Sequence, residues 1–423
     1  MGALFLFYIY IDNFKAMKKI LCMIIFCQLF LANAFSQAFI NYTRFNSPLP
    51  DNSVRAIAID SQGRKWFGTD YGMAIFDDTN WTVYTTVNSG ISDNSIKCIR
   101  FDAAGNAWIC TQLGGINKFD GTTFTVFNTS NSGITSDFVR NVSIDINDVK
   151  WICTDNGLNR FDNATWTHWD ISNSGIPVNS LACLAAETDS QRWVGTVNGG
   201  FSDMFDTTFI TYNLVNGGFP DNSILAIVID TLGYKWCATP AGGLVRFYGT
   251  TGYVYNTGNS TIPTDGFDAV ALDSLQNIYL GSYDKGVVKK QGNNFLNYDM
   301  ANSPMPDDLI YSVAVERTGI IWAGTSVEGV VRIDEALYTP VNNPNGRPAF
   351  AVYPNPVMDF ITVKSLQNDV QSIRILNMQG QLVLEENNVF LPKRIDVHAL
   401  PPGIYFLSFV GENKTETKKV IKM

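Results

Sequence analysis

One aromatic pattern returns along the chain at a nearly constant spacing. A tryptophan or tyrosine, here called the anchor, is followed three residues later by threonine or serine, as in KWFGT from Lys65, and the anchors are 42 or 43 residues apart. Repeats of ~40–50 residues that contain several short apolar runs are typical of four-stranded propeller blades. Seven copies therefore predict an all-β chain with a seven-bladed β-propeller. The anchors are Trp66, Trp108, Trp151, Trp193, Trp236, Tyr279 and Trp322.

The first copy shows how one repeat is expected to fold. Its β-branched and apolar runs at 54–60, 65–69, 73–76 and 79–86 predict the four antiparallel strands of one blade. An acidic residue ends the first run in every copy, and Asp60 is expected to bind backbone N–H groups of its own turn. The regular anchors are expected to fill the space between neighbouring sheets. The repeated threonine is expected to make a hydrogen bond between blades.

The ends of the repeat array predict how the ring closes. The seventh copy stops after three strands, before the Pro- and Asn-rich stretch TPVNNPNGRP. The stretch AFINYTRFNSPLPDN from Ala38 matches NNFLNYDMANSPMPDD from Asn293, which contains the fourth strand of copy six. We therefore expect the N-terminal strand to complete the last blade, which removes an open sheet edge.

The first 36 residues have the features of a secretory signal peptide. Basic Lys18 and Lys19 precede an apolar run, and small residues follow at Ala34 and Ser36. Cleavage is predicted before residue 37, and Met17 is the expected true start. No later stretch is apolar enough to span a bilayer, so no integral membrane segment is expected in the mature chain.

Charge and cysteine usage exclude several classes of function. The net charge is −9 and both ends carry more bases than acids, so the repeats are strongly acidic. A surface of that sign repels phosphate backbones, and nucleic acid is not an expected partner. Two of the seven cysteines precede the cleavage site. Of the other five, Cys98, Cys110, Cys153 and Cys183 stand at registers that otherwise hold small residues, where buried thiols are expected. Neither a metal site nor a cofactor is predicted.

Residues that differ between copies are the candidates for binding, because a ligand site needs asymmetry. In propellers the loops after the second strand share one face with the loops that lead into the first. Three neighbouring copies carry Arg55, Lys97 and Arg140 at the start of the first strand, which predicts a site for a uronate or sulfate. The alternative is that these bases pair with loop acids such as Asp51 and Asp93. The further candidates on this face are Tyr71, Tyr283, Asp284 and Tyr311.

The repeats resemble a known family. NSVRAIAIDSQGRKWFGTDYGMAIFD, residues 52–77, is similar to the two-component-regulator propeller repeat, whose pattern is D-x-x-G-x-x-W-x-G-T. The resemblance covers residues 38 to about 338, although copies three, four and six lack the turn glycine, at Asp148, Ser190 and Gln276. In that family the repeats often form the sensor half of a membrane kinase that reads polysaccharide fragments. No kinase follows here, so that role is not carried over.

Residues 349–423 resemble the C-terminal sorting domain of the type IX secretion system. VYPNPVMDFITV, IRILNMQGQLV, IDVHALPPGIYFLSF and KKVIKM stand in the order of that family. The resemblance implies the type IX machinery as partner, export through the outer membrane, and release from or attachment to the cell surface. The same residues predict a small β-sandwich, so the expected domains are a propeller over 37–340, a linker over 341–348 and a sandwich over 349–423. The motif residues are Tyr353, Pro354, Asn355, Pro356, Gly380, Gly403, Tyr405 and Lys419.

Two functions from different classes stay open. The first is a secreted or cell-surface binding module without catalysis, whose partner is an acidic polysaccharide or another surface protein. The second is an extracellular polysaccharide lyase or glycosidase. The two histidines, His168 on an expected outer strand and His398 in the sorting domain, are poorly placed for acid–base work. Tyrosine with arginine, or paired carboxylates, could supply it instead.

Overall fold

The computed structural model describes residues 38–216, 218–338, 350–353, 355–365, 370–387, 389–411 and 415–423. The predicted signal peptide, the predicted linker and Pro354 lie outside these residues. Within the described part of the chain no helix is long and apolar enough to cross a membrane.

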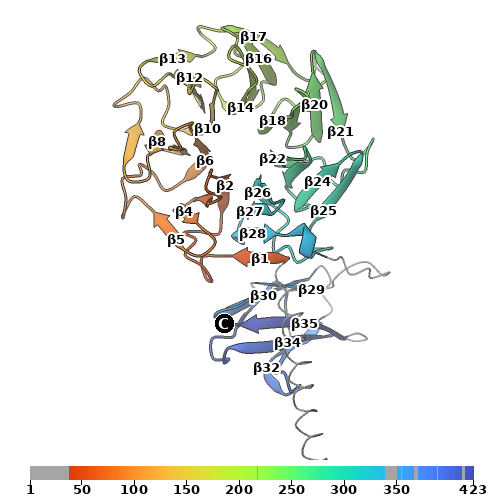
Figure 1. Ribbon diagram of the computed structural model, residues 1–423. Helices are drawn as coiled ribbons and strands as arrows, with labels where there is room; N and C mark the ends of the chain where they lie inside the picture. Colours follow the sequence, from red (N-terminus) through yellow and green to blue (C-terminus); the bar gives the residue numbers. More distant parts are fainter. Residues whose placement is uncertain are drawn as a thin grey trace, which may run out of the picture.

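Seven four-stranded antiparallel sheets surround a central channel (Figure 1). The first strand of each sheet lies innermost, and the innermost strands of neighbouring blades contact one another around the ring, including β26 against β2. The strands, from the channel outward, are β2 (Val54–Ile59), β3 (Lys65–Thr69), β4 (Gly72–Phe76) and β5 (Trp81–Tyr84) in blade 1; β6 (Ile96–Phe101), β7 (Ala107–Thr111), β8 (Ile116–Phe119) and β9 (Phe124–Phe127) in blade 2; β10 (Val139–Ile144), β11 (Lys150–Thr154), β12 (Gly157–Phe161) and β13 (Trp166–Trp169) in blade 3; β14 (Leu181–Ala186), β15 (Gln191–Thr196), β16 (Phe201–Phe205) and β17 (Thr208–Tyr212) in blade 4; β18 (Ala226–Ile229), β19 (Lys235–Ala238), β20 (Leu244–Tyr248) and β21 (Thr251–Tyr255) in blade 5; β22 (Phe267–Leu272), β23 (Ile278–Ser282), β24 (Val287–Gln291) and β25 (Asn294–Tyr298) in blade 6; and β26 (Ile310–Val315), β27 (Ile321–Thr325), β28 (Val330–Ile333) and β1 (Phe39–Tyr42) in blade 7.

The outer strand of the first blade is shorter than the sequence predicts. It spans Trp81–Tyr84 instead of residues 79–86. On one side Asp77 accepts hydrogen bonds from the backbone N–H groups of Thr79 and Asn80. On the other side the N–H group of Thr85 binds Asn88 Oδ1 at 2.7 Å. The flanking residues therefore bond to turn side chains and cannot join the sheet.

The N-terminal strand closes the ring as predicted. β1 pairs antiparallel with β28, and Phe39 faces Ile333 while Tyr42 faces Val330. The ring of Tyr42 also stacks on Trp322 with centroids 5.9 Å apart. The first strand of the chain thus completes the last blade. The short 3-10 helix η1 (Glu335–Leu337) follows β28.

The apolar core lies between neighbouring blades. Trp66 and Met73 of blade 1, for example, share one buried cluster with Ile96 and Ile109 of blade 2. Close packing explains the register of small residues two positions after the anchor. A Cβ atom on Gly324 would lie 2.4 Å from the carbonyl oxygen of Val54 in the next blade. The five cysteines in the described residues are buried free thiols, and Cys98, Cys110, Cys153 and Cys183 stand at registers of small residues, as expected.

Each anchor is tied to the acidic residue that ends the first strand of its own blade. Asp60 accepts two backbone N–H groups of its turn, as predicted, and its Oδ2 also accepts the indole N–H of Trp66 at 2.9 Å. The same anchor-to-acid bond occurs in all seven blades. The repeated threonine does not bridge blades, so that expectation was wrong. Thr69 Oγ1 donates to the carbonyl of Gly72 at 2.7 Å, which closes a turn inside one blade.

The C-terminal residues form two small sheets that pack face to face around their own core. One sheet contains β29 (Phe350–Tyr353), β30 (Phe360–Ser365) and β33 (Lys393–Asp396). The other contains β32 (Leu382–Asn387), β31 (Val370–Leu376), β34 (Gly403–Gly411) and β35 (Thr415–Lys422). Buried Val363, Ile375 and Leu407 belong to one shared cluster. The predicted β-sandwich is confirmed.

Several sorting-motif residues hold the ends of these strands. Asn355 donates to the carbonyl of Lys419 at 3.0 Å and accepts the N–H group of Ile421 at 2.8 Å. Tyr405 donates to the carbonyl of Pro401 at 2.8 Å. The two Asn355 bonds tie the motif to the last strand of the domain, β35.

Candidate functional site

A β-bulge opens the innermost strand in six of the seven blades. At each bulge the pairing with the second strand skips one residue near the start of the first strand. A bulge turns the extra side chain out of the ladder, and here it faces the channel. Leu225 stands at the equivalent place just before β18. These seven residues, called the mouth residues, are Arg55, Lys97, Arg140, Ala182, Leu225, Asp268 and Tyr311.

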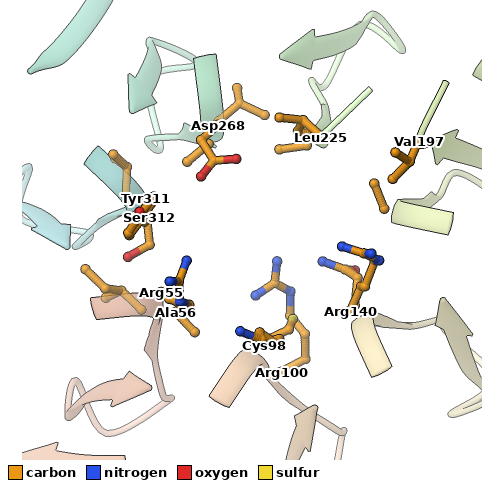
Figure 2. A pocket seen from close by; sticks show the side chains of 18 of the residues that line it. Arg55, Ala56, Cys98, Arg100, Arg140, Val197, Leu225, Asp268, Tyr311 and Ser312 are labelled. Carbon is orange, nitrogen blue, oxygen red and sulfur yellow. The ribbon is translucent and has the colours of Figure 1, made fainter. Parts of the chain in front are cut away.

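The mouth residues line a single cavity of about 320 Å³ in the channel (Figure 2). The structure therefore brings together Arg55, Lys97, Arg140 and Tyr311, four of the seven candidates from the sequence. The lining is strongly asymmetric. Blades 1 to 3 supply bases, blades 4 and 5 supply Ala182 and Leu225, and blades 6 and 7 supply an aspartate and a tyrosine.

Two acids from the loops after the second strands bind the mouth bases. Arg55 Nε lies 2.7 Å from Asp70 Oδ1, and Lys97 Nζ lies 3.7 Å from the same oxygen. Arg140 Nε lies 2.8 Å from Asp155 Oδ1. The bases therefore pair with loop acids, as the alternative expected, but the acids are Asp70 and Asp155 and not Asp51 and Asp93. Their carboxylates accept backbone N–H groups of the loops, from Ser53 in the first case and from Ser95 and Leu113 in the second.

The ion pairs leave one side of each guanidinium facing the cavity. Within the described residues Arg55 and Arg140 bind their carboxylates through Nε alone. The Arg55 guanidinium also lies 4.5 Å from the ring centre of Tyr311. Burial and the neighbouring charge of Arg55 lower the pKa of Lys97. The Nη groups of Arg140 therefore stay available to an anion, while the Arg55 side chain also interacts with the Tyr311 hydroxyl.

Arg100 is a channel base that sequence reasoning missed. It lines the same cavity, three residues further along β6 than Lys97, and Figure 2 shows it pointing into the channel. Its Nη1 donates to the carbonyl of Ile99 at 2.9 Å, and it makes no ion pair with a carboxylate in the described residues. The sequence did contain a sign that Arg100 is unusual, because the other copies hold small or apolar residues at this register. They are Ala58, Ser143, Ala185, Val228, Ala271 and Ala314.

Asp268 faces these bases across the channel (Figure 2). Burial raises the pKa of Asp268 to about 6, against the opposing effect of Arg55. The charged group that influences it is Arg55. At the rim, burial and the charge of Asp268 raise the pKa of Tyr283. The carboxylate makes no hydrogen bond in the described part of the chain. It is available to a hydroxyl group of a ligand.

The remaining candidates lie outside the cavity lining. Tyr283 is 37% exposed at the rim, and Asp284 beside it is also exposed. Tyr71 is 67% exposed and is not part of the lining. His168 lies on the outer strand β13. Among the described residues no group of three or more His, Cys, Asp or Glu side chains could hold a metal ion.

Two stretches of the chain match protein families. Residues 351–423 match the family described as the secretion system C-terminal sorting domain. Residues 48–71 match the two component regulator propeller. No curated protein matches the chain.

Solved structures share the fold. The extracellular domain of a hybrid two component system from B. thetaiotaomicron has a TM-score of 0.61 and 22% identity, over 91% of this chain and 57% of that one. PorZ, a surface component of the type IX secretion system of Porphyromonas gingivalis, has a TM-score of 0.56 and 16% identity, over 88% and 60%. The present chain thus spans about three fifths of either protein. Virginiamycin B lyase from Staphylococcus aureus has a TM-score of 0.56 and 10% identity, over 70% and 98%.

A type IX sorting domain directs a protein through the outer membrane to the cell surface, so this is an exported protein. The propeller neighbours are too distant in sequence to add more than the fold. The chain is thus a β-propeller that matches the two component regulator propeller over residues 48–71 and the secretion system C-terminal sorting domain over residues 351–423.

Proposed function

We propose that this protein is a non-catalytic binding module of the cell surface that binds acidic polysaccharide at the mouth of its propeller channel. One observation carries the proposal. Four basic residues, Arg55, Lys97, Arg100 and Arg140, converge on one cavity in a chain whose net charge is −9. Sugar carboxylates and sulfates are anions that a guanidinium binds through two parallel hydrogen bonds. Tyr311 and Phe138 add aromatic surface to the same cavity.

Replacing Arg55, Lys97 and Arg140 together by Ala is expected to abolish retention of the protein on an acidic polysaccharide column. Stability should change little, because partly exposed ion pairs contribute on the order of 0–1 kcal/mol each. Asp70 also keeps its hydrogen bonds to Ser53 and Ser95. Affinity chromatography and thermal melting of the same preparations measure the two effects.

The matched control replaces Arg64 and Arg317, which lie on turns between first and second strands, away from the cavity. This pair should leave retention unchanged. Retention that survives the triple substitution would contradict the anion site. A wild-type protein that binds no acidic glycan would make another surface protein the better partner.

Binding is expected to strengthen as the pH falls from about 7 to about 5. Asp268 has a raised pKa of about 6, so it is charged at the higher pH and protonated at the lower one, where ligand carboxylates are still mostly ionised. Loss of one negative charge several ångströms from a bound anion is worth ~1 kcal/mol, or about fivefold in affinity. The Asp268→Asn variant loses the charge but keeps a group that can bind a hydroxyl, so it should bind more tightly near pH 7 and show no such pH dependence in calorimetry.

The control for this experiment is Asp284→Asn, because Asp284 is exposed outside the cavity. It should keep the wild-type pH profile. A wild-type affinity that does not change between these pH values would argue against contact between ligand and Asp268.

A second candidate function is a polysaccharide lyase or glycosidase. The observation in its favour is that Asp268, a carboxyl group with a pKa of about 6, shares the cavity with Tyr311 and Arg55. A carboxyl group that titrates near neutrality is suited to general acid or base work. New reducing ends in an acidic polysaccharide incubated with the protein would favour this function, provided that Tyr311→Phe or Tyr283→Phe removes them. Binding without new reducing ends favours the binding module.

A further inference from the structure

The channel wall is closed around the candidate site. Residues from all seven blades line the cavity, and the innermost strands of the last and first blades are joined by a hydrogen bond from Ser312 Oγ to the carbonyl of Val54 at 3.0 Å. In the described residues the innermost strands of neighbouring blades contact one another around the ring, so a glycan chain cannot pass between two blades to reach the cavity. A ligand must enter along the channel axis.

The cavity is also small. Its volume of about 320 Å³ is at the lower end of the ~300–1,000 Å³ that small-molecule sites occupy. A long polymer cannot be enclosed in such a space. A chain end or a short side branch is the part of a polymer that suits a space of this size.

The charges are arranged along the axis as well as around it. Arg100 stands three residues beyond Lys97 on β6, or ~10 Å further along the strand before the bulge is allowed for. The small residues at this register in neighbouring blades, Ala58 and Ser143, leave room around its side chain. Asp268 lies across the channel with no hydrogen-bond partner in the described residues (Figure 2). A ligand with an anionic group on one side and a hydroxyl group on the other could bind Arg100 and Asp268 at the same time.

From this arrangement we infer that the channel recognises the end of an acidic glycan chain, with the anionic group of the terminal sugar on Arg100 and a hydroxyl group nearer the mouth on Asp268. This inference rests on the proposed function and refines it. The mouth bases Arg55, Lys97 and Arg140 then hold the sugars that follow the terminal one. The anion is a carboxylate or a sulfate ester, because a guanidinium binds both.

The test uses galacturonic acid as a short oligomer and as the long polymer, titrated into the full-length protein by calorimetry. End recognition predicts the same affinity per chain for both, so the affinity per sugar falls in proportion to chain length. It also predicts a fixed number of proteins per chain. Proteins that bind in numbers rising with polymer length would overturn end recognition and leave the proposed function intact. No binding of any acidic glycan would overturn both.

Two variants locate the contact. Arg100→Ala should weaken oligomer binding by at least about tenfold, the usual effect of losing a hydrogen bond to a charged group, and Arg100→Lys should restore part of it. Arg317→Ala, a change of the same kind on an exposed turn, should have no effect. Unchanged binding by folded Arg100→Ala would overturn the inference.

Two further ligands separate the sources of the anion. The first is a glycan whose terminal sugar carries a sulfate ester and no carboxylate. If the protein binds this glycan and does not bind galacturonate, end recognition is supported with sulfate as the anion. A peptide with a free C-terminal carboxylate that competes as well as the glycan would overturn the assignment to a sugar.

Discussion

Deletion of residues 37–44 is expected to lower the melting temperature of the propeller by roughly 10–20 °C. The deletion removes β1, the fourth strand of blade 7, and leaves the edge of β28 unpaired. It also removes Phe39, which packs against Tyr298 and Tyr338, and Tyr42, which packs against Trp322. Differential scanning calorimetry of the propeller with and without these residues measures the effect.

A graded series shows whether pairing or packing causes the loss. Tyr42→Ala keeps the strand but removes one buried ring, and should lower the melting temperature by a smaller amount. Tyr71→Ala is the control, because Tyr71 is 67% exposed, and it should melt like the wild type. A deletion variant with an unchanged melting curve would show that the ring does not depend on its N-terminal strand.

Removal of residues 349–423 is expected to reduce the amount of protein outside the cell to background. The truncated propeller should accumulate in the periplasm in a folded state. Its buried clusters contain propeller residues alone, and the sandwich residues form a separate cluster. Immunoblots of medium, surface-exposed and periplasmic fractions, with limited proteolysis to test folding, give the measurement.

A point variant makes the same test without a truncation. Asn355→Ala removes the two bonds that tie the sorting motif to β35 and should reduce export while the propeller stays folded. Ser53→Ala, a single polar change in the propeller, should not affect export. Truncated protein at wild-type levels outside the cell would contradict the role of the sorting domain.

Much of the fold could be predicted because its physical cause is local and repeated. The anchor spacing of 42 or 43 residues sets the length of one blade, since four short strands and their turns need that much chain. The match between the stretches that contain Phe39 and Phe295 predicted ring closure because the same outer-strand pattern occurs at both ends of the array. The bond from each anchor to its acid was not predicted, although both residues were marked as structural. The threonine was assigned to the wrong partner, because spacing alone cannot say which carbonyl lies nearest.

The site could be predicted only in outline. That Arg55, Lys97 and Arg140 share one face follows from their equal place in three successive repeats. Their acidic partners did not follow, because Asp51 and Asp93 are close in sequence but are taken up by loop N–H groups. Arg100 was missed because the bulge cannot be read from the sequence. In a regular strand Lys97 and Arg100 would point to opposite faces, whereas the bulge at Lys97 lets both line the same cavity.

The sequence by itself determined the number of blades, the closing strand and the sorting domain, since these depend on periodicity and on motifs read along the chain. The tertiary structure decided which charges meet. Residues more than 200 positions apart, such as Arg55 and Asp268, become neighbours only when seven blades close into a ring. The bulges then turn their side chains into one cavity, where burial raises the pKa of Asp268 to about 6. Burial and proximity of this kind are properties of the closed ring, and no single repeat contains them.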